Sequence, residues 1–162
     1  MKRWLLRILI VTAALALSVI AVGQAGWLTG TPPSTLGVRD GRLTPPALSP
    51  NSVSSQANLY PDHPQRETAY VAPLLFSGDA DSALEQLATV IRTMPRARIV
   101  TLQPGYMRAE FQTPLLHYTD DLELWLDRAN GVIQVRSASR IGESDLGVNR
   151  ARVETIRKSL PP

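Results

Sequence analysis

The sequence predicts a two-layer α+β domain, an antiparallel sheet of about four to five strands with two helices on one face, preceded by an N-terminal membrane helix. Three observations give this prediction: an apolar run after a basic N-terminus, two segments with a helical apolar period, and four strand-like segments joined in pairs by turn dipeptides. A run of strands flanked by helices favours this class, because each layer buries one apolar face against the other.

The first 28 residues have the organisation of a membrane-targeting segment. Three basic residues among the first seven precede a largely apolar run that extends through Leu28. About 20 such residues span a bilayer, and flanking basic residues stay in the cytoplasm. Residues 4–28 therefore predict an uncleaved signal-anchor, or a signal peptide cleaved after Ala25. An anchor would hold the protein in the cytoplasmic membrane with its N-terminus inside and its domain in the periplasm; cleavage would secrete the domain.

The net charge of the chain comes from this leader. The sequence has 17 basic and 14 acidic side chains, a formal charge of +3. Without Lys2, Arg3 and Arg7, 17 minus 3 leaves 14 basic side chains against the same 14 acidic ones. Nucleic acid is excluded as a partner, because the exported part lacks the basic excess that binding needs. The absence of cysteine excludes disulfides and thiolate chemistry.

A Pro- and Ser-rich segment, residues 29–66, follows the leader. It has few large apolar residues, so we expect a linker that packs along the domain in extended form. The domain itself is predicted over residues 67–162. Its first strand is expected at Tyr70–Phe76, and at a sheet edge, because Pro73 has no N–H for a strand ladder.

Two helices are predicted from apolar residues that recur every three to four positions. The first covers Asp79–Met94, with a capping box at Ser82 and Glu85 and a stop at Pro95. Its core stripe comprises Leu84, Leu87, Ile91 and Met94. The second begins near Asp145 or Asn149, either of which could cap it, and its stripe comprises Leu146, Asn149, Val153, Ile156 and Leu160.

Four strands are expected between these helices, in two hairpins. Pro104-Gly105 favours a type II turn, and Asn130-Gly131 favours a two-residue hairpin loop. The strands flanking these turns are Arg98–Leu102, Tyr106–Gln112, Leu116–Asp127 and Val132–Ser139.

The second hairpin places charged and aromatic residues on the sheet face away from the helices. With a two-residue loop, Leu126 faces Val135 and Leu124 faces Ser137 on the core side. Trp125 then faces Arg136 and Asp121 faces Arg140, so that a guanidinium can stack on the indole and another can pair with the carboxylate. Glu123 shares this face. Trp125 needs cover from the Pro-rich segment or from a partner.

The segment from Val135 to Arg152 is unusually polar. With the facing strand it supplies the candidate ligand or partner site, which comprises Arg136, Ser137, Ser139, Arg140, Ser144, Asp145, Asn149, Arg150, Asp121 and Trp125. Two interpretations remain open: a structural network that joins the last strand to the last helix, and a site whose arginines hold an anionic group. A pocket near Arg140, Ser144 and Asn149 would favour a ligand, and a flat exposed face would favour docking.

The same segment resembles a known family. Residues 131–154, GVIQVRSASRIGESDLGVNRARVE, are similar to the bacterial and plastid family named domain of unknown function 1499. Asp120-Asp121, Pro95-Arg96-Ala97 and Ser49-Pro50-Asn51 match it as well, over roughly residues 43–160. The resemblance implies an exported, often membrane-anchored domain with no established activity, cofactor or catalytic residue. Members usually carry cysteines where this chain has Pro46 and Ser52, so a cysteine-based mechanism is excluded here.

No motif indicates catalysis. The serines of the polar segment, with His117 and Asp145, are the ingredients of a hydrolytic triad, but no Gly-x-Ser-x-Gly elbow accompanies them. Asp120 and Asp121 are adjacent on a strand and so point to opposite faces. We assign no catalytic, cofactor-binding or metal-binding residue, and no cofactor is expected.

Two functional hypotheses follow. The first is a non-catalytic accessory or binding module, in the membrane, that docks an envelope protein through the face of Trp125, Arg136 and Arg140. The alternative is a small-ligand carrier or hydrolase that binds an anionic group at residues 136–150. Whether the protein is an enzyme stays open, with a non-catalytic role preferred.

Overall fold

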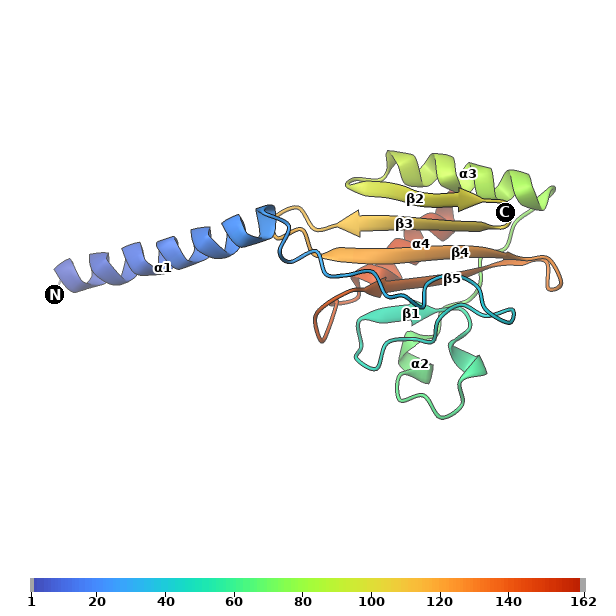
Figure 1. The fold of residues 1–162 in the computed structure, drawn as a ribbon, viewed down its shortest axis with the longest axis horizontal. Helices are drawn as coiled ribbons and strands as arrows, with labels where there is room; N and C mark the ends of the chain where they lie inside the picture. Colours follow the sequence, from blue (N-terminus) through green and yellow to red (C-terminus); the bar gives the residue numbers. More distant parts are fainter. Residues whose placement is uncertain (1, 161–162) are drawn as a thin grey trace.

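The computed structural model describes residues 2–160; positions 1, 161 and 162, which the predicted leader and domain include, lie outside the described residues. A long apolar helix, α1 (Lys2–Gln24), projects away from the domain (Figure 1). Gly23 is the one residue of α1 that is buried. The helix is long and apolar enough to cross a bilayer, as the sequence predicts.

The domain is built on a five-stranded antiparallel sheet. Its strand order is β1-β5-β4-β3-β2. The strands are β1 (Ser52–Ser54), β2 (Ala97–Gln103), β3 (Tyr106–Gln112), β4 (Thr119–Asp127) and β5 (Val132–Ser139). Helices α3 (Ala80–Thr93) and α4 (Val148–Ser159) lie on one face of the sheet, which confirms the predicted α+β architecture (Figure 1). A short 3-10 helix, η1 (Ala57–Leu59), and the one-turn helix α2 (Arg66–Ala69) lie beside β1.

The core lies between the sheet and the two helices. Alternate residues of the strands point into it, and the predicted helical stripes supply the other side. Its buried members include Leu84, Leu87, Ile91, Met107, Ala109, Leu122, Leu124, Ile133, Val135, Val153 and Ile156. We call the opposite side of the sheet the outer face.

The predicted first strand at Tyr70–Phe76 is wrong. This segment makes two isolated bridges, Tyr70 with Ser54 and Leu74 with Ile133. The edge strand is β1 instead, from the Pro- and Ser-rich part of the chain, and it pairs with residues 136–138 of β5. Because β1 already occupies that half of the β5 edge, only the other half, at Ile133, is left for Leu74.

The predicted register of the β4–β5 hairpin is wrong by two residues. Asp127 pairs with Val132, which leaves a four-residue loop, residues 128–131, in place of two. The Asp127 carboxylate accepts hydrogen bonds from the Asn130 backbone N–H at 3.2 Å and from its side-chain amide at 2.7 Å, and these contacts stabilise the longer loop. A two-residue shift keeps every side chain on its predicted face, because the strand period is two.

This shift changes which residues face each other. Leu124 pairs with Val135, Leu122 with Ser137 and Leu126 with Ile133 on the core side. On the outer face, Glu123 pairs with Arg136, Trp125 with Gln134 and Asp121 with Ala138. The expected stacking of Arg136 on Trp125 is therefore replaced by an ion pair between Arg136 and Glu123.

Several element ends also differ from the prediction. Asp79, rather than Ser82, is the N-cap of α3, and its carboxylate accepts from the Ser82 backbone N–H at 2.8 Å. β4 begins at Thr119 because residues 113–118 close a turn, with the Thr113 N–H donating to the Tyr118 carbonyl. Leu146, expected in the α4 stripe, precedes the helix and is 93% exposed.

Candidate functional site

The outer face of the sheet is covered by the protein's own chain. Residues 29–50, which we call the strap, cross it as an irregular segment with a tight turn between Arg39 and Arg42 (Figure 1). The Gly37 N–H donates to Glu123 Oε1 at 2.7 Å, and Arg136 Nε donates to the Pro45 carbonyl at 3.2 Å. Arg140 Nη1 donates to the Gly30 carbonyl at 3.4 Å. The strap therefore lies directly on the charged side chains that the sequence assigned to this face.

Beneath the strap lies the outer-face charge cluster: Arg98, Arg108, Arg136 and Arg140 with Glu110, Asp121 and Glu123. Arg140 is at its centre and is 6% exposed at the side chain. Its Nε and Nη2 donate to the two Asp121 oxygens at 2.8 and 2.9 Å, and Nη2 also donates to Glu110. These hydrogen bonds, that to Asp121 above all, raise the pKa of Arg140.

The two carboxylates are shared with further arginines. Arg108 Nη1 donates to Asp121 Oδ1 at 2.9 Å, and Arg98 Nη2 donates to Glu110 Oε2 at 2.6 Å. Burial acts to raise the pKa of Glu110, but the hydrogen bonds from Arg140 and Arg98 outweigh it, so the net shift is downward. Glu110 is thus held ionised by pairing with several arginines.

The most deeply buried pair is Glu123 with Arg136. Glu123 Oε1 accepts from the Gly37 N–H and from the Tyr106 hydroxyl at 2.8 Å. Its other oxygen lies 3.6 Å from Arg136 Nη1, too far for a hydrogen bond, and neither atom has another partner. Burial lowers the pKa of Arg136, and burial together with the Glu123 charge raises that of Tyr106. The pair is therefore deeply buried, and its facing atoms are not satisfied by other protein groups.

A cavity of about 290 Å³ opens beside this pair, between strap and sheet; we call it the strap cavity. Asp121, Arg136 and Arg140 line it on the sheet side, and Pro33, Ala47 and Asn51 line it on the other. Arg136 and Asn51 each also have a buried polar atom without a hydrogen-bond partner, Nη1 and Oδ1 respectively. In the part of the chain that the structure describes, Glu123 Oε2 is the one other such atom.

A second polar network lies on the helix side of the sheet and is saturated. Asn149 is fully buried and accepts from Ser137 Oγ at 2.6 Å and from Arg152 Nη1. Its amide donates to the Asn51 carbonyl and to Ser139 Oγ, both at 3.1 Å. This network joins β5 to α4, which is the structural interpretation of the polar segment.

Arg152 closes that network. Its Nη2 donates to Asp120 Oδ2 at 2.6 Å, and its guanidinium lies 4.4 Å from the centre of the Phe111 ring. Asp120 thus points to the helices while its neighbour Asp121 points to the strap, as the strand alternation predicts.

A second hollow, of about 510 Å³ and lined by both polar and apolar side chains, lies at the end of the domain next to α1. Ser139, Ser144 and Asp145 line it, together with apolar side chains of Ile141, Leu146 and Val148. It shares Ser139, Ile141 and Gly142 with the strap cavity. Of the three residues around which a pocket was expected, Ser144 lines this hollow and Arg140 lines the strap cavity, whereas Asn149 lies within the core.

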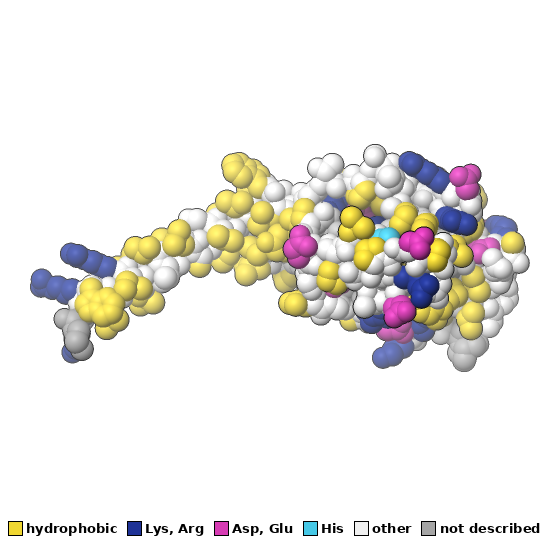
Figure 2. Space-filling view, turned by 90° about the horizontal axis from the view of Figure 1, so that it is seen from below, with side chains coloured by type: hydrophobic (Ala, Val, Ile, Leu, Met, Phe, Trp, Pro, Cys, Tyr) yellow, Lys and Arg dark blue, Asp and Glu magenta, His cyan; other side chains and the backbone are white. Residues whose placement is uncertain are grey.

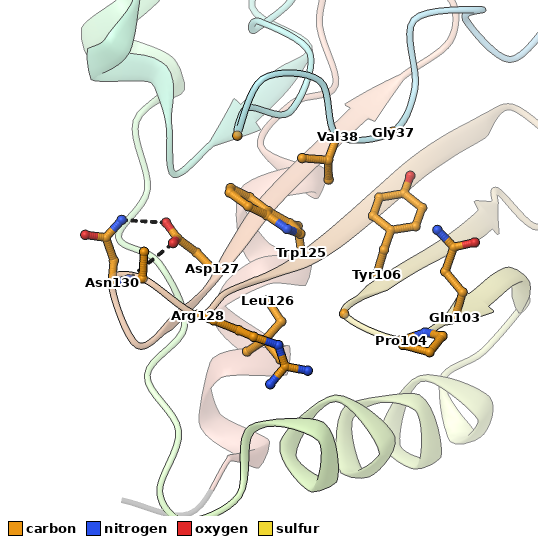
Figure 3. A pocket seen from close by; sticks show the side chains of 13 residues that line it. Gly37, Val38, Gln103, Pro104, Tyr106, Trp125, Leu126, Asp127, Arg128 and Asn130 are labelled. Atoms are coloured by element: carbon orange, nitrogen blue, oxygen red, sulfur yellow. Dashed lines mark hydrogen bonds between the residues drawn. The ribbon is translucent and has the colours of Figure 1, made fainter.

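Trp125 lies in a cleft of about 750 Å³ at the opposite end of the sheet. The cleft is bounded by Gly37, Val38 and Gly41 of the strap and by the β2–β3 and β4–β5 turns. Figure 3 shows the rings of Trp125 and Tyr106, which are paired across β4 and β3, beneath Val38. Trp125 is half-buried, and Gly37, Val38 and Gly41 of the strap lie around its cleft.

The structure therefore distributes the sequence-predicted site residues over separate places. Arg136, Arg140 and Asp121 meet under the strap; Ser137, Ser139 and Asn149 join β5 to α4. Ser144 and Asp145 line the hollow near α1, Trp125 lies in the far cleft, and Arg150 donates to the Thr68 carbonyl at 2.7 Å.

Sequence reasoning missed six members of these networks: Tyr106, Arg108, Glu110, Asn51, Arg152 and Arg98. Tyr106, Arg108 and Glu110 alternate along β3 on the face that carries Asp121 and Glu123 of β4, so strand alternation could have indicated them. Asn51 and Arg152 come from an apparent linker and from a helix, and no local pattern places them.

The ingredients of a hydrolytic triad are not assembled. Ser137 Oγ donates to Asn149, and the structure shows no hydrogen bond between the His117 side chain and Ser137, Ser139 or Ser144. His117 lies in the turn before β4 with φ of 55°. The described residues also contain no group of three or more His, Cys, Asp or Glu side chains arranged to hold a metal ion.

Comparisons with known proteins agree with the sequence resemblance. The family model described as protein of unknown function DUF1499 matches residues 42–160. The match therefore includes part of the strap, β1 and every element through α4. Comparisons with curated proteins and with solved structures found no match. The chain belongs to the DUF1499 family.

Proposed function

We propose that this protein is a membrane-anchored, non-catalytic binding module whose strap cavity holds a small anionic group, a carboxylate or a phosphate. The observation that carries the proposal is the unpartnered Nη1 of Arg136 in a residue that lines the cavity. A buried guanidinium N–H without an acceptor is costly, and an anion at this position would supply the acceptor.

The charge balance of the cluster favours an anion. It contains four guanidinium groups and three carboxylates, a formal excess of one positive charge. Arg140 and Arg108 each pair with both Asp121 and Glu110, and Arg98 pairs with Glu110. Arg136 differs, because its ion-pair partner Glu123 stands off at 3.6 Å. A monoanion beside Arg136 would neutralise the cluster.

The second unpartnered atom, Asn51 Oδ1, narrows the chemistry of the ligand. Asn51 Oδ1 is an amide oxygen and only accepts hydrogen bonds; the amide is oriented by its Nδ2, which donates to the Gly142 carbonyl at 2.6 Å. A ligand that satisfies both Arg136 and Asn51 needs an acceptor oxygen and a donor group. A hydrogen-bearing phosphate and a hydroxylated carboxylate both have these groups.

The anchor is the other half of the proposal. The end of α1 packs on the β3–β4 turn: Gln24 Nε2 donates to the Leu115 carbonyl at 2.8 Å, and a Cβ on Gly23 would lie 2.7 Å from Leu116 Cα. These contacts support a retained helix, with residues 4–28 in the cytoplasmic membrane and the domain on the periplasmic side.

The proposal is tested by titrating the full chain in detergent with inorganic phosphate and with glycolate, at constant ionic strength set with chloride. We expect saturable heat in calorimetry and a melting temperature that rises with ligand concentration, because the ligand binds only the folded state. Absence of a saturable response to either anion would refute an anion site.

Two variants separate the site from the fold. Arg136→Met removes the unpaired donor and should abolish the response, while Ala47→Phe fills the cavity without changing any charge and should do the same. Arg128→Ala, which breaks an exposed ion pair with Asp81 outside the cavity, is the matched control and should keep the response. A response that survives in both cavity variants would place the anion elsewhere.

The Trp125 cleft favours a second candidate, docking of an envelope protein. Its half-buried indole, at the end of the sheet away from α1, is open to a partner from the aqueous side. A photo-reactive amino acid at Val38 should crosslink a protein in native membranes, and one at Leu75 should not. The product should disappear with Trp125→Ala; crosslinking that is unaffected by this change would contradict docking at the cleft.

A further inference from the structure

The end of the domain that adjoins α1 carries a group of exposed apolar side chains. Gln24 and Gly23, at the last turn of α1, contact the 113–118 turn directly. The 140–147 loop lies beside them, since Gly30, six residues after α1, packs against Arg140 and Ile141. If α1 spans a bilayer, both loops lie at its surface.

The exposed side chains at this end come from three separate stretches of sequence. Trp27 is 79% exposed, Leu115 is 54% exposed and Leu146 is 93% exposed. Tyr118, Ile141 and Val148 are exposed to lesser degrees and, with Leu146, surround the 510 Å³ hollow. Figure 2 shows hydrophobic side chains continuing from α1 onto the adjoining part of the domain. On an ordinary protein surface exposed leucines are scattered singly, whereas here three chain segments bring exposed apolar side chains together in one rim.

The conformation of Leu146 adds a second observation. Its φ is 53°, in the left-handed region that large side chains rarely adopt. The turn is held by Asp145, whose carboxylate accepts from the N–H groups of Gly147 at 3.0 Å and Asn149 at 2.8 Å. A backbone in the left-handed region thus presents a leucine that is 93% exposed.

We propose that this rim rests in the surface of a phospholipid bilayer, and that lipid chains fill the hollow between Ile141, Leu146 and Val148. The contact would be a second membrane attachment beside α1, made by the folded domain. Among residues 113–118 and 141–149 there is no lysine or arginine, and the charged side chains there are Glu143 and Asp145. The rim therefore fits insertion of apolar side chains rather than attraction to anionic lipid.

The inference rests on the anchor half of the proposed function, so the test measures both. The chain has no cysteine, which allows single labels by Leu15→Cys in α1, Leu115→Cys and Leu146→Cys in the rim, and Leu75→Cys as a matched exposed leucine elsewhere. Each full-length variant is labelled with bimane and reconstituted in phosphatidylcholine vesicles that contain lipids with a nitroxide on the acyl chain.

We expect strong quenching of the labels at positions 15, 115 and 146 and at least twofold weaker quenching at position 75. Replacing part of the phosphatidylcholine by phosphatidylglycerol should leave the quenching at position 146 unchanged. Quenching at position 15 with none at position 146 above that at position 75 would overturn this inference and leave the anchor intact. No quenching at position 15 would overturn the proposal that α1 is a membrane anchor, and with it the proposed contact of the rim with the bilayer.

Discussion

Removal of the Asn149 side-chain amide is the sharpest test of what holds the domain together. In the fully buried network between β5 and α4 this side chain makes four hydrogen bonds, with Ser137, Arg152, Asn51 and Ser139. Asn149→Ala deletes all four and leaves a void at a position with no solvent access. The variant therefore measures how much these buried hydrogen bonds contribute to the stability of the domain.

The expected loss of stability follows from counting partners that remain satisfied. The Asn51 carbonyl keeps the Ser139 backbone N–H at 3.0 Å, and Arg152 keeps Asp120 and Ser137. The Ser137 and Ser139 hydroxyls lose a buried partner. At about 1 kcal/mol for each of the four net hydrogen bonds, the expected loss is about 4 kcal/mol. In a domain of this size that lowers the melting temperature by roughly 10–20 °C.

The assay is thermal and urea unfolding of the full chain in detergent, followed by circular dichroism. Asn58→Ala, the same change at an exposed residue of η1, is the matched control and should change stability by less than about 0.5 kcal/mol. A loss below about 1 kcal/mol for Asn149→Ala would refute the conclusion that the network is structural.

Three further outcomes are expected. Tyr106→Phe removes a hydrogen bond from the buried Glu123 carboxylate and should destabilise the domain by about 1–3 kcal/mol in urea unfolding. Stability should fall as the pH drops below 4.5, the ordinary pKa of a glutamate, because Glu110 then takes up a proton in the unfolded chain while its lowered pKa keeps it ionised in the folded protein. Glu110→Gln should reduce the dependence of stability on pH in this range. Gly23→Val would clash with Leu116 and should speed cleavage after the exposed Trp27 by chymotrypsin in reconstituted protein.

Each of these outcomes has its own control. Tyr70→Phe, at a partly exposed tyrosine, should have little effect, and an equal loss there would contradict the role assigned to the Glu123 contact. An unchanged acid slope in Glu110→Gln would show that other carboxyl groups govern acid unfolding. Ala21→Val, at an exposed position of α1, should leave the cleavage rate unaltered.

The polar segment shows how far sequence reasoning reached. Strand alternation correctly placed Asp121, Glu123 and Arg136 on the outer face, and the apolar stripe of α4 correctly turned Asn149 inward. The partner of Arg136 was wrong, because a turn dipeptide does not fix loop length when Asp127 can stabilise a longer loop. The ion pair between Asp121 and Arg140 formed in spite of the shift, since long side chains also reach diagonal neighbours.

The candidate cavity depended on contacts that no local pattern contains. Composition alone gives a Pro- and Ser-rich strap no reason to cover a sheet, yet its Gly37 and Pro45 backbone groups meet the buried charges of Glu123 and Arg136. β1 likewise comes from a stretch that lacks a strand pattern, and its polar residues are buried because β5 offers an unpaired edge.

The sequence by itself determined the apolar helix α1, the helices α3 and α4, the strands β3 and β5, and the face on which the residues of these two strands lie. These depend on periods of 2 and 3.6 residues, which are written along the chain. Only the tertiary structure decided the hairpin register, the edge strand, the strap and the two cavities beside Ser139. They depend on which distant groups satisfy buried charges and open strand edges, and that choice is made when the segments pack together.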